Sequence, residues 1–386
     1  MRRASGTHRR PGRMTAPITA SLPEASSATP VTPIFTVLID TYNYAHYIED
    51  AVRSVLAQKF PAELREILVI DDGSTDDTET RMAKFGDAIR YFKKANGGQA
   101  SAFNFGLQHA RGEYVALLDA DDVWLPDKLQ RIHQAFQNHP DAGMAYHRLY
   151  QWMNGGTGAQ AGEELSTLGH FIAVSGRVTD SRFSLLCYPM MQTSSLVFRL
   201  AAMQDLLPVP EVLRTQADAF LTALIIFICP VVAVDEYLAK YRLHGANQFY
   251  GATRGLSRLQ LENRIATRNA LMLAIRDWLR RHGIDCESPN IRDYLRQWDK
   301  AQEIDRFALR APNFWEYFKH LVEFPVRYRE LMTGRELIYN YVRAFAALLL
   351  GYGGLHHFDE FYARRKNRAT PPDNSGGSRA KDDAAR

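Results

Sequence analysis

The stretch Leu117–Trp124, which reads LLDADDVW, decides how the rest of this sequence is interpreted. An apolar run, Tyr114–Leu118, leads directly into three carboxylates, Asp119, Asp121 and Asp122. A short apolar run bounded by polar residues is typical of a buried strand. The acids would then follow its carboxyl end, which is the edge where open parallel sheets bind their ligands.

The three acids indicate a cation site. Like charges that are packed together repel each other, so such a cluster normally needs a cation. Oxygen ligands with no His or Cys beside them suit Mg²⁺ or Mn²⁺. The alternative is a solvated acidic loop that caps the next helix, because Pro126 and Asp127 have the pattern of a helix start.

Strands alternate with helices around this stretch. The predicted strands are Phe35–Ile39, Glu66–Ile70, Ile89–Phe92 and Tyr114–Leu118, and the predicted helices are Tyr47–Gln58, Asp76–Phe85 and Gln99–Ala110. This alternation predicts an α/β fold with a doubly wound, mostly parallel sheet. Polar loops at 40–43, 71–74 and 119–122 should meet at one edge and form a binding site.

The usual phosphate-binding loops are absent from the sequence. No G-x-G-x-x-G follows the first strand, and no G-x-x-x-x-G-K-[ST] occurs anywhere in the chain. Dinucleotide oxidoreductases and P-loop enzymes are therefore disfavoured.

The chain is predicted to divide into four regions. Residues 1–33 lack the apolar core of a signal peptide and read as a disordered leader. The sheet domain is expected over 34–250, with a short buried helix and a strand within Leu221–Val234, and a helical C-terminal region over 251–368. Residues 369–386 read as a disordered tail. The three cysteines are far apart and form no CxxC pair, which fits a reducing, cytoplasmic compartment.

Charge is spread unevenly along the chain. Residues 1–250 carry a net charge of −3 and residues 251–386 carry +7. The C-terminal region mixes aromatic with basic residues, namely Phe314, Trp315, Phe318, Phe324, Lys319, Arg327 and Arg329. This mixture predicts peripheral contact with the inner face of the cytoplasmic membrane. A helical layer packed on the sheet domain is the alternative, and no nucleic-acid partner is expected.

The chain resembles family 2 glycosyltransferases with the GT-A fold over residues 34–250. The matching stretches are DTYNYAHYIEDAVRSVLAQ (40–58), VIDDGSTDDT (69–78), NGGQASAFNFGL (96–107), GEYVALLDADDVWLPDKL (112–129), TSSLVFR (193–199) and YLAKYRLHGAN (237–247). Asp40 stands where the family usually has Pro, and we expect it to shape the first loop rather than the chemistry. Ala217 replaces the acid that usually precedes the family's catalytic base.

The resemblance implies an inverting, metal-dependent hexosyl transfer. The donor would be a nucleotide-sugar, UDP-linked, and the acceptor a hydroxyl of a glycan or a lipid-linked molecule in surface polysaccharide synthesis. The QxxRW-type motif of processive synthases is absent from the sequence, which weakens a polymerising activity.

The resemblance also implies roles for single residues on the donor side. Thr41 and Tyr42 match loop residues that line the nucleoside pocket. Asp71 matches the acid that binds the base, and Asp119 matches the acid that contacts the ribose. Capping of the following helix is the alternative role for Asp71 and its neighbour Asp72.

Metal and catalytic roles follow from the same resemblance. Asp121 matches the metal-binding acid, with Asp122 as an extra acid beside it, and His244 would reach the metal or the diphosphate. Asp218 matches the catalytic base. Its predicted place at a helix N-terminus should keep its carboxylate ionised near neutral pH.

Two rival classes remain open on the sequence. A metal-dependent nucleotidyltransferase would use similar acids, although such enzymes usually carry a Gly- and Lys-rich loop where this chain reads DTYNY. A non-catalytic nucleotide-sugar-binding module would keep the fold, and the missing acid at Ala217 leaves it open.

Overall fold

A computed structural model describes residues 32–153, 164–167, 191–244, 257–310, 314–329, 332, 334 and 336–346. Residues 1–31 of the predicted leader and the whole predicted tail, 369–386, lie outside the described residues.

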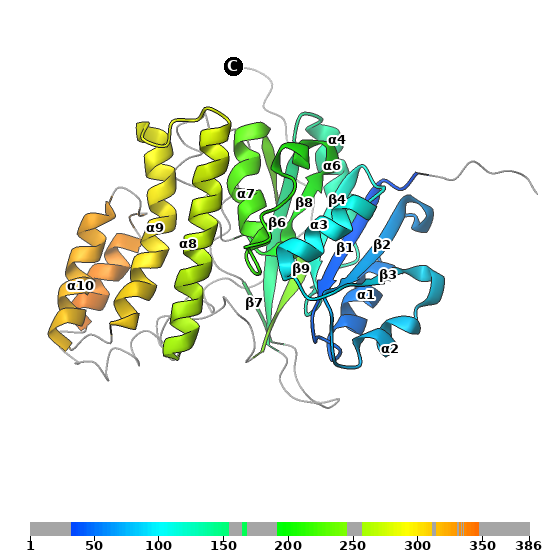
Figure 1. The fold of residues 1–386 in the computed structure, drawn as a ribbon, viewed down its shortest axis with the longest axis horizontal. Coiled ribbons are helices and arrows are strands. Elements are labelled where there is room, and N and C mark those ends of the chain that lie inside the picture. The colour runs from blue at the N-terminus through cyan, green and yellow to red at the C-terminus, as the bar shows by residue number, and fades with distance from the viewer. Residues whose placement is uncertain are drawn as a thin grey trace, which may run out of the picture. The chain divides into compact units, whose positions relative to one another are not determined.

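Four parallel strands form the half of the sheet that ends in the predicted loops (Figure 1). They are β1 (Phe35–Thr41), β2 (Arg65–Asp71), β3 (Arg90–Lys93) and β4 (Tyr114–Asp119), in the order β3-β2-β1-β4. The helices between them are α1 (Ile48–Leu56), α2 (Thr78–Ala83) and α3 (Gln99–His109). The predicted parallel, doubly wound arrangement is confirmed. β1 extends further than predicted, because Asp40 and Thr41 are strand residues and the loop begins at Tyr42.

The second half of the sheet is partly antiparallel. Its strands are β8 (Val197–Arg199), β6 (Met144–Met153), β9 (Val231–Leu243), β5 (Val123–Trp124) and β7 (Glu164–Thr167). β8 runs antiparallel to both β4 and β6, whereas β6 and β9 are parallel. The matching stretch 193–199 forms a single turn, η3 (Thr193–Ser195), followed by β8. The remaining short elements are α4 (Lys128–Asn138), α6 (Leu200–Met203), η1 (Ala62–Leu64), η2 (Gly86–Ala88) and η4 (Gln204–Leu206).

Alternating side chains build a core on each face of the sheet. Leu38 and Leu117 belong to the cluster that includes α3 and α7 (Ala217–Ile228). Ile39 and Leu118 belong to the cluster that includes α1 and α4. Successive strand residues point to opposite faces. The residue that follows each leucine by two positions, Asp40 or Asp119, is therefore on the α3–α7 face.

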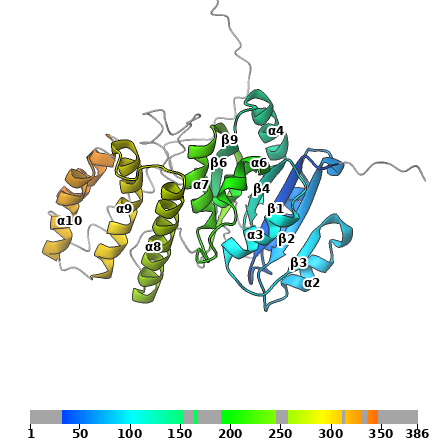
Figure 2. The same cartoon turned by 45° about the horizontal axis from the view of Figure 1, so that its top comes forward.

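The C-terminal helices extend outward from α7, and α8 and α9 contact it. They are α8 (Arg258–Arg281), α9 (Pro289–Leu309), α10 (Phe314–Arg327) and a helix over 336–346. Figures 1 and 2 show α8 beside α7 and α9 beside α8. The indole of Trp278 donates to the carbonyl of Asp205 at 2.9 Å, and the Tyr294 hydroxyl donates to the carbonyl of Ala223 at 2.8 Å. No helix among the described residues combines the length and apolarity that crossing a bilayer requires.

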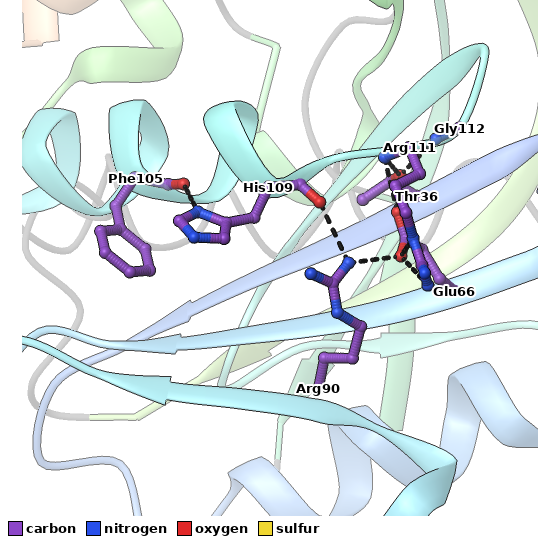
Figure 3. A network of polar contacts seen from close by, with 7 residues as sticks. All are labelled: Thr36, Glu66, Arg90, Phe105, His109, Arg111 and Gly112. Atoms are coloured by element: carbon purple, nitrogen blue, oxygen red, sulfur yellow. Dashed lines mark hydrogen bonds and ion pairs between the residues drawn. The ribbon is translucent and has the colours of Figure 1, made fainter.

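Glu66 links the amino ends of the parallel strands, at the end of the sheet opposite the predicted site (Figure 3). Its buried carboxylate accepts hydrogen bonds from the Thr36 hydroxyl at 2.7 Å, from Arg90 at 2.7 Å, and from the backbone and guanidinium of Arg111. Burial works to raise the pKa of Glu66, but these donors outweigh it and hold the pKa below its usual value. The network joins β1, β2 and β3 to the turn that leads into β4.

We expect Glu66→Gln to lower the free energy of unfolding by roughly 2 kcal/mol, because donors to a charged acceptor would lose their charge-assisted bonds. Urea denaturation at neutral pH measures this loss. A lowered folded-state pKa contributes stability above the unfolded value and loses it as pH falls through the folded value. The gap between Glu66→Gln and the wild type should therefore close in acid. Glu63→Gln, at an exposed acid nearby, is the matched control, and an equal effect of both variants would contradict the role of the network.

Candidate functional site

The acids of the LLDADDVW stretch converge as predicted at the carboxyl end of β4. Carboxylate oxygens of Asp119, Asp121 and Asp122 lie within 4.8 Å of one another. Asp121 and Asp122 are buried and Asp119 is half-buried. The backbone N–H of Asp119 donates to the Ser194 hydroxyl at 3.1 Å, which fixes the end of the strand. Such a set of hard oxygen ligands fits Mg²⁺ or Mn²⁺.

Arg242, at the end of β9, holds the acidic turn Asp121–Asp122 through hydrogen bonds. Its backbone N–H donates to Asp122 at 2.9 Å, and its guanidinium donates to the carbonyl of Asp121 at 2.7 Å and to Asp50 at 2.8 Å. The guanidinium also lies 4.9 Å from the centre of the Tyr47 ring. These contacts hold the turn in place, so the backbone of Asp121 is fixed by Arg242, which is itself anchored on Asp50 of α1.

His244 and Asp121, the two predicted metal ligands, are brought together. The Nε2 atom of His244 lies 2.8 Å from a carboxylate oxygen of Asp121. The His244 ring is stacked on Tyr47, with ring centres 4.9 Å apart. Ligation of a metal by both residues remains a prediction, supported by this proximity.

The end of β1 holds the two residues predicted to line a nucleoside pocket. Thr41 is buried, and its hydroxyl has no hydrogen-bond partner among the described residues. Tyr42 is 46% exposed, so its ring is accessible for contact with a flat ligand. Asn43 adopts a φ of 60°, and its side chain accepts the backbone N–H of Thr75 at 2.8 Å. The loop after β1 is thereby tied to the loop after β2.

Asp71 is held firmly rather than left free at the end of β2. One carboxylate oxygen accepts the backbone N–H of Ser74 at 2.7 Å, and the other accepts the hydroxyl of Tyr91. Asp77 occupies the cap position of α2, so the alternative that Asp71 or Asp72 caps this helix is wrong. Base binding by Asp71 remains a prediction, and it would use the second lone pair of an oxygen that already accepts one bond.

Asp72 has a role that the sequence did not indicate. Its carboxylate accepts hydrogen bonds from the Lys94 ammonium at 2.6 Å and from the backbone N–H groups of Gly97 at 2.9 Å and Gly98 at 2.6 Å. Gly98 has a φ of +88°, and a Cβ there would lie 2.5 Å from Cα of Arg214. Asp72 thus holds the NGG loop against the segment that leads into α7.

Asp218 lies in the first turn of α7, as predicted. The Thr193 hydroxyl donates to its carboxylate at 3.1 Å, and Gln99 accepts the backbone N–H of Ala217 at 2.9 Å. Ionisation of Asp218 near neutral pH remains a prediction, and burial of the carboxyl opposes it. Burial raises its pKa, and the opposing bonds from Thr193 and the Ala219 backbone offset that effect only in part.

Asp40 is a site residue that the sequence analysis misplaced. It was expected to shape the first loop, but it lies in β1 with its Cα paired to that of Asp119. Burial, followed by the charges of Asp218 and Asp121, raises the pKa of Asp40 to about 7. The period-two alternation that continues from Leu38 could have placed it on this face.

The acids raise one another's pKa. Burial raises the pKa of Asp119 well above its usual value, with further contributions from Asp40, Asp122 and Asp121 in that order. Burial and the charge of Asp121 likewise raise the pKa of Asp122. Protons and a divalent cation would therefore compete for these carboxylates.

A mostly parallel sheet that carries acids at this edge, with helices on both faces, defines a GT-A type fold. The family model "Glycosyl transferase family 2" matches residues 36–184. An uncharacterised glycosyltransferase of Nostoc sp. is 37% identical over 226 residues, which make up 57% of this chain and 68% of that protein. The chain therefore belongs to glycosyltransferase family 2, which favours a glycosyltransferase over a nucleotidyltransferase.

One further relative and one solved structure are also similar to this chain. The putative teichuronic acid biosynthesis glycosyltransferase TuaG of Bacillus subtilis is 41% identical over 103 residues, covering 26% of this chain and 40% of that protein. The crystal structure of S. aureus TarS 1–349 in complex with UDP-GlcNAc has a TM-score of 0.54 and 19% sequence identity, covering 86% of this chain and 92% of that one. The second likeness shows a shared fold.

We expect Mn²⁺ or Mg²⁺ to raise the melting temperature, and to raise it more at about pH 8 than at about pH 6, because the cation competes with protons on the acids. A raised folded-state pKa, such as that of Asp40, contributes stability below the unfolded value and loses it as pH rises through about 7. The metal-free protein should therefore be least stable on the alkaline side, where a cation restores most. Thermal unfolding with and without metal tests both statements.

Asp121→Asn removes one charge from the cluster and should abolish most of this metal-dependent shift. Asp77→Asn, at an exposed acid outside the cluster, should keep the wild-type shift. An unchanged shift in Asp121→Asn would place the cation elsewhere.

Proposed function

We propose that this glycosyltransferase moves a hexose, with inversion, from a UDP-linked sugar to an acceptor hydroxyl in the synthesis of a surface polysaccharide or a similar glycan. The observation that carries the proposal is the junction made by η3. Ser194 accepts the backbone N–H of Asp119, while Thr193 donates to Asp218. Acids suited to the donor and an acid suited to the acceptor are thereby fixed side by side.

The donor side of the proposal uses the residues at the ends of β1, β2 and β4. Thr41 and Tyr42 would line the nucleoside pocket, Asp71 would accept the base N–H, and Asp119 would bind the ribose. Asp121 and His244 would hold Mg²⁺ or Mn²⁺, with Asp122 behind them. A bound divalent cation would supply charge neutralisation at the leaving diphosphate. The UDP-GlcNAc of the TarS structure and the teichuronic acid assignment of TuaG support this choice of donor and product class.

The transfer step follows from the position of Asp218. The acceptor hydroxyl gives its proton to the Asp218 carboxylate as its oxygen attacks the anomeric carbon. The bond from that carbon to the diphosphate oxygen breaks, and the nucleoside diphosphate leaves with the electron pair. The raised pKa of Asp218 makes it a stronger proton acceptor once it is ionised, so transfer should increase as pH rises through that pKa.

A panel of nucleotide-sugars, each with Mn²⁺, Mg²⁺ or chelator, tests the class and the donor together. Release of nucleoside diphosphate from one donor, dependent on metal, supports the proposal. Release from none of them, with donor binding intact, would favour a non-catalytic nucleotide-sugar-binding module.

We expect Asp218→Asn to slow transfer by about 10²–10⁴-fold, because the amide cannot accept the proton of the acceptor hydroxyl. Calorimetric titration should show that the affinity for nucleoside diphosphate with Mn²⁺ is retained. Asp205→Asn, at an exposed acid in η4, is the matched control and should transfer normally. Transfer by Asp218→Asn at more than roughly a tenth of the wild-type rate would assign the base to another residue.

We further propose peripheral contact of the C-terminal helices with the inner face of the cytoplasmic membrane. The residues that support it differ from those expected. Phe324 is buried and Phe318 packs against other helices, whereas Trp315 is 67% exposed and Phe345 is 61% exposed. The exposed apolar residues on 314–346 recur at helical spacing, and they are Trp315, Val322, Val326, Ile338, Tyr341, Val342 and Phe345. Amphipathic helices with exposed aromatic residues suit a lipid interface.

Co-sedimentation with anionic phosphatidylglycerol vesicles at low and high salt tests this contact. The wild type should pellet at low salt, and a Trp315→Ser/Phe345→Ser variant should pellet much less because it exposes less apolar surface. Leu259→Ser, at an exposed leucine of α8, is the control. No pelleting of the wild type at low salt would favour helices that serve only the sheet domain.

A further inference from the structure

Asp40 lies beside Asp119 on one face of the sheet. The two residues are register partners on adjacent parallel strands, and each follows by two positions a leucine buried in the α3–α7 core. Asp218 is in the first turn of α7, which covers this same face. The Asp40 carboxyl therefore faces the space between the acids of β4 and the start of α7.

The Asp40 carboxyl has an unused acceptor. Its Oδ1 atom is buried and has no hydrogen-bond partner among the described residues. A buried carboxyl oxygen that lacks a partner costs free energy, so it is a strong acceptor for any ligand hydroxyl placed against it. Asp71 contrasts with Asp40, because both of its oxygens already accept hydrogen bonds within the protein.

The position of Asp40 differs from that of the metal-binding acids. Asp119, Asp121 and Asp122 can offer oxygens within 4.8 Å of one another, and Asp40 is not part of this set among the described residues. The charges that act on Asp40 come from Asp218 first and from Asp121 next. Through its pairing with Asp119 and its place on the face that α7 covers, Asp40 is near both the acid proposed as metal ligand and the acid proposed as base.

The geometry of an in-line displacement defines what occupies that space. The anomeric carbon must lie between the leaving oxygen of the diphosphate and the attacking oxygen of the acceptor. The leaving oxygen belongs near Asp121, and the attacking oxygen belongs near Asp218. The ring of the transferred sugar therefore lies beside Asp40.

We propose that Asp40 determines donor specificity by accepting a hydrogen bond from a hydroxyl of the transferred sugar. This inference rests on the proposed function, because it takes the base and the metal ligand from it. A site that binds a substrate hydroxyl through a charged, buried acceptor discriminates strongly against analogues without that hydroxyl. The ligand class is a hexose hydroxyl on a nucleotide-sugar, and the nucleoside and diphosphate lie outside the reach of this contact.

The experiment compares binding of three probes to wild type and Asp40→Ala: the donor found in the panel, its single-deoxy analogues, and the free nucleoside diphosphate, each with Mn²⁺. Asp40→Ala should weaken binding of the intact donor by about 10- to 100-fold and leave nucleoside diphosphate affinity within about twofold. One deoxy analogue should bind wild type and Asp40→Ala equally, because the contact is already missing.

Controls separate this contact from a general loss of structure. Asp40→Asn keeps the shape of the side chain and serves as the second variant in case Asp40→Ala does not fold. It should weaken donor binding by about tenfold. Asp77→Ala, at an exposed acid outside the site, should bind all probes as the wild type does. Thermal unfolding verifies that each variant is folded.

Several outcomes would overturn the inference. Unchanged donor affinity in both Asp40 variants removes any contact with the sugar. An equal loss for donor and nucleoside diphosphate, or weaker Mn²⁺ binding, would make Asp40 a nucleotide or metal ligand instead. If the wild type binds no nucleotide-sugar, the proposed function itself is wrong. If the wild type binds its donor and both Asp40 variants bind that donor with the same affinity, only this inference is wrong.

Discussion

The crowding of carboxyl groups at one edge of the sheet is the constraint on which the rest of the structure depends. Asp40 and Asp119 are register partners near the ends of adjacent strands, and the charges of Asp121 and Asp218 act on both of them. Like charges in a partly buried setting repel far more strongly than in water. The surrounding protein must therefore hold these groups in place against their own repulsion, and neutral donors do much of this.

Those donors come from parts of the chain that are far apart in sequence. The turn at Thr193–Ser194 reaches both β4 and α7, and Arg242 fixes the acidic turn from β9. The antiparallel half of the sheet is what brings these segments to the acids, through β8 beside β4 and β9 beside β6. The parallel half supplies the acids of β1, β2 and β4, while the second half supplies Asp218 and His244 and holds the acidic turn in place.

Much of this could be predicted from the sequence, for physical reasons that apply to particular elements. The strands β1, β2 and β4 are continuous apolar runs, and the polar residues that end them locate the site edge. The buried helix that ends before Pro230 and the strand after it also follow from local pattern, although α7 begins earlier than the predicted Leu221 and β9 continues to Leu243. The apolar letters of β1 end at Ile39, so the strand was predicted to stop there, although the period-two alternation from Leu38 places Asp40 on the sheet face. The clasp that Asp72 makes on the NGG loop is also hidden, since it depends on backbone groups more than twenty residues away.

The membrane-facing expectation illustrates a different limit. The aromatic and basic residues in 314–329 have the composition of a membrane-binding surface, but helix packing buries Phe324 and leaves Trp315 exposed. Composition counts residues, whereas a surface depends on which side of each helix is turned outward.

The apolar character of α7 has a consequence for how this chain can be divided or can diverge. Eight of the twelve residues of α7 are buried, with the sheet on one side and Leu271, Ile275 and Trp278 of α8 in the same core cluster. The catalytic-type domain and the helices after residue 257 are therefore one cooperative unit at this seam. A gene that exchanged its C-terminal helices for another module would have to bring along a replacement cover for α7. The replacement would pack directly against the helix whose first turn carries Asp218, so an exchange of the C-terminal helices would act next to the proposed base.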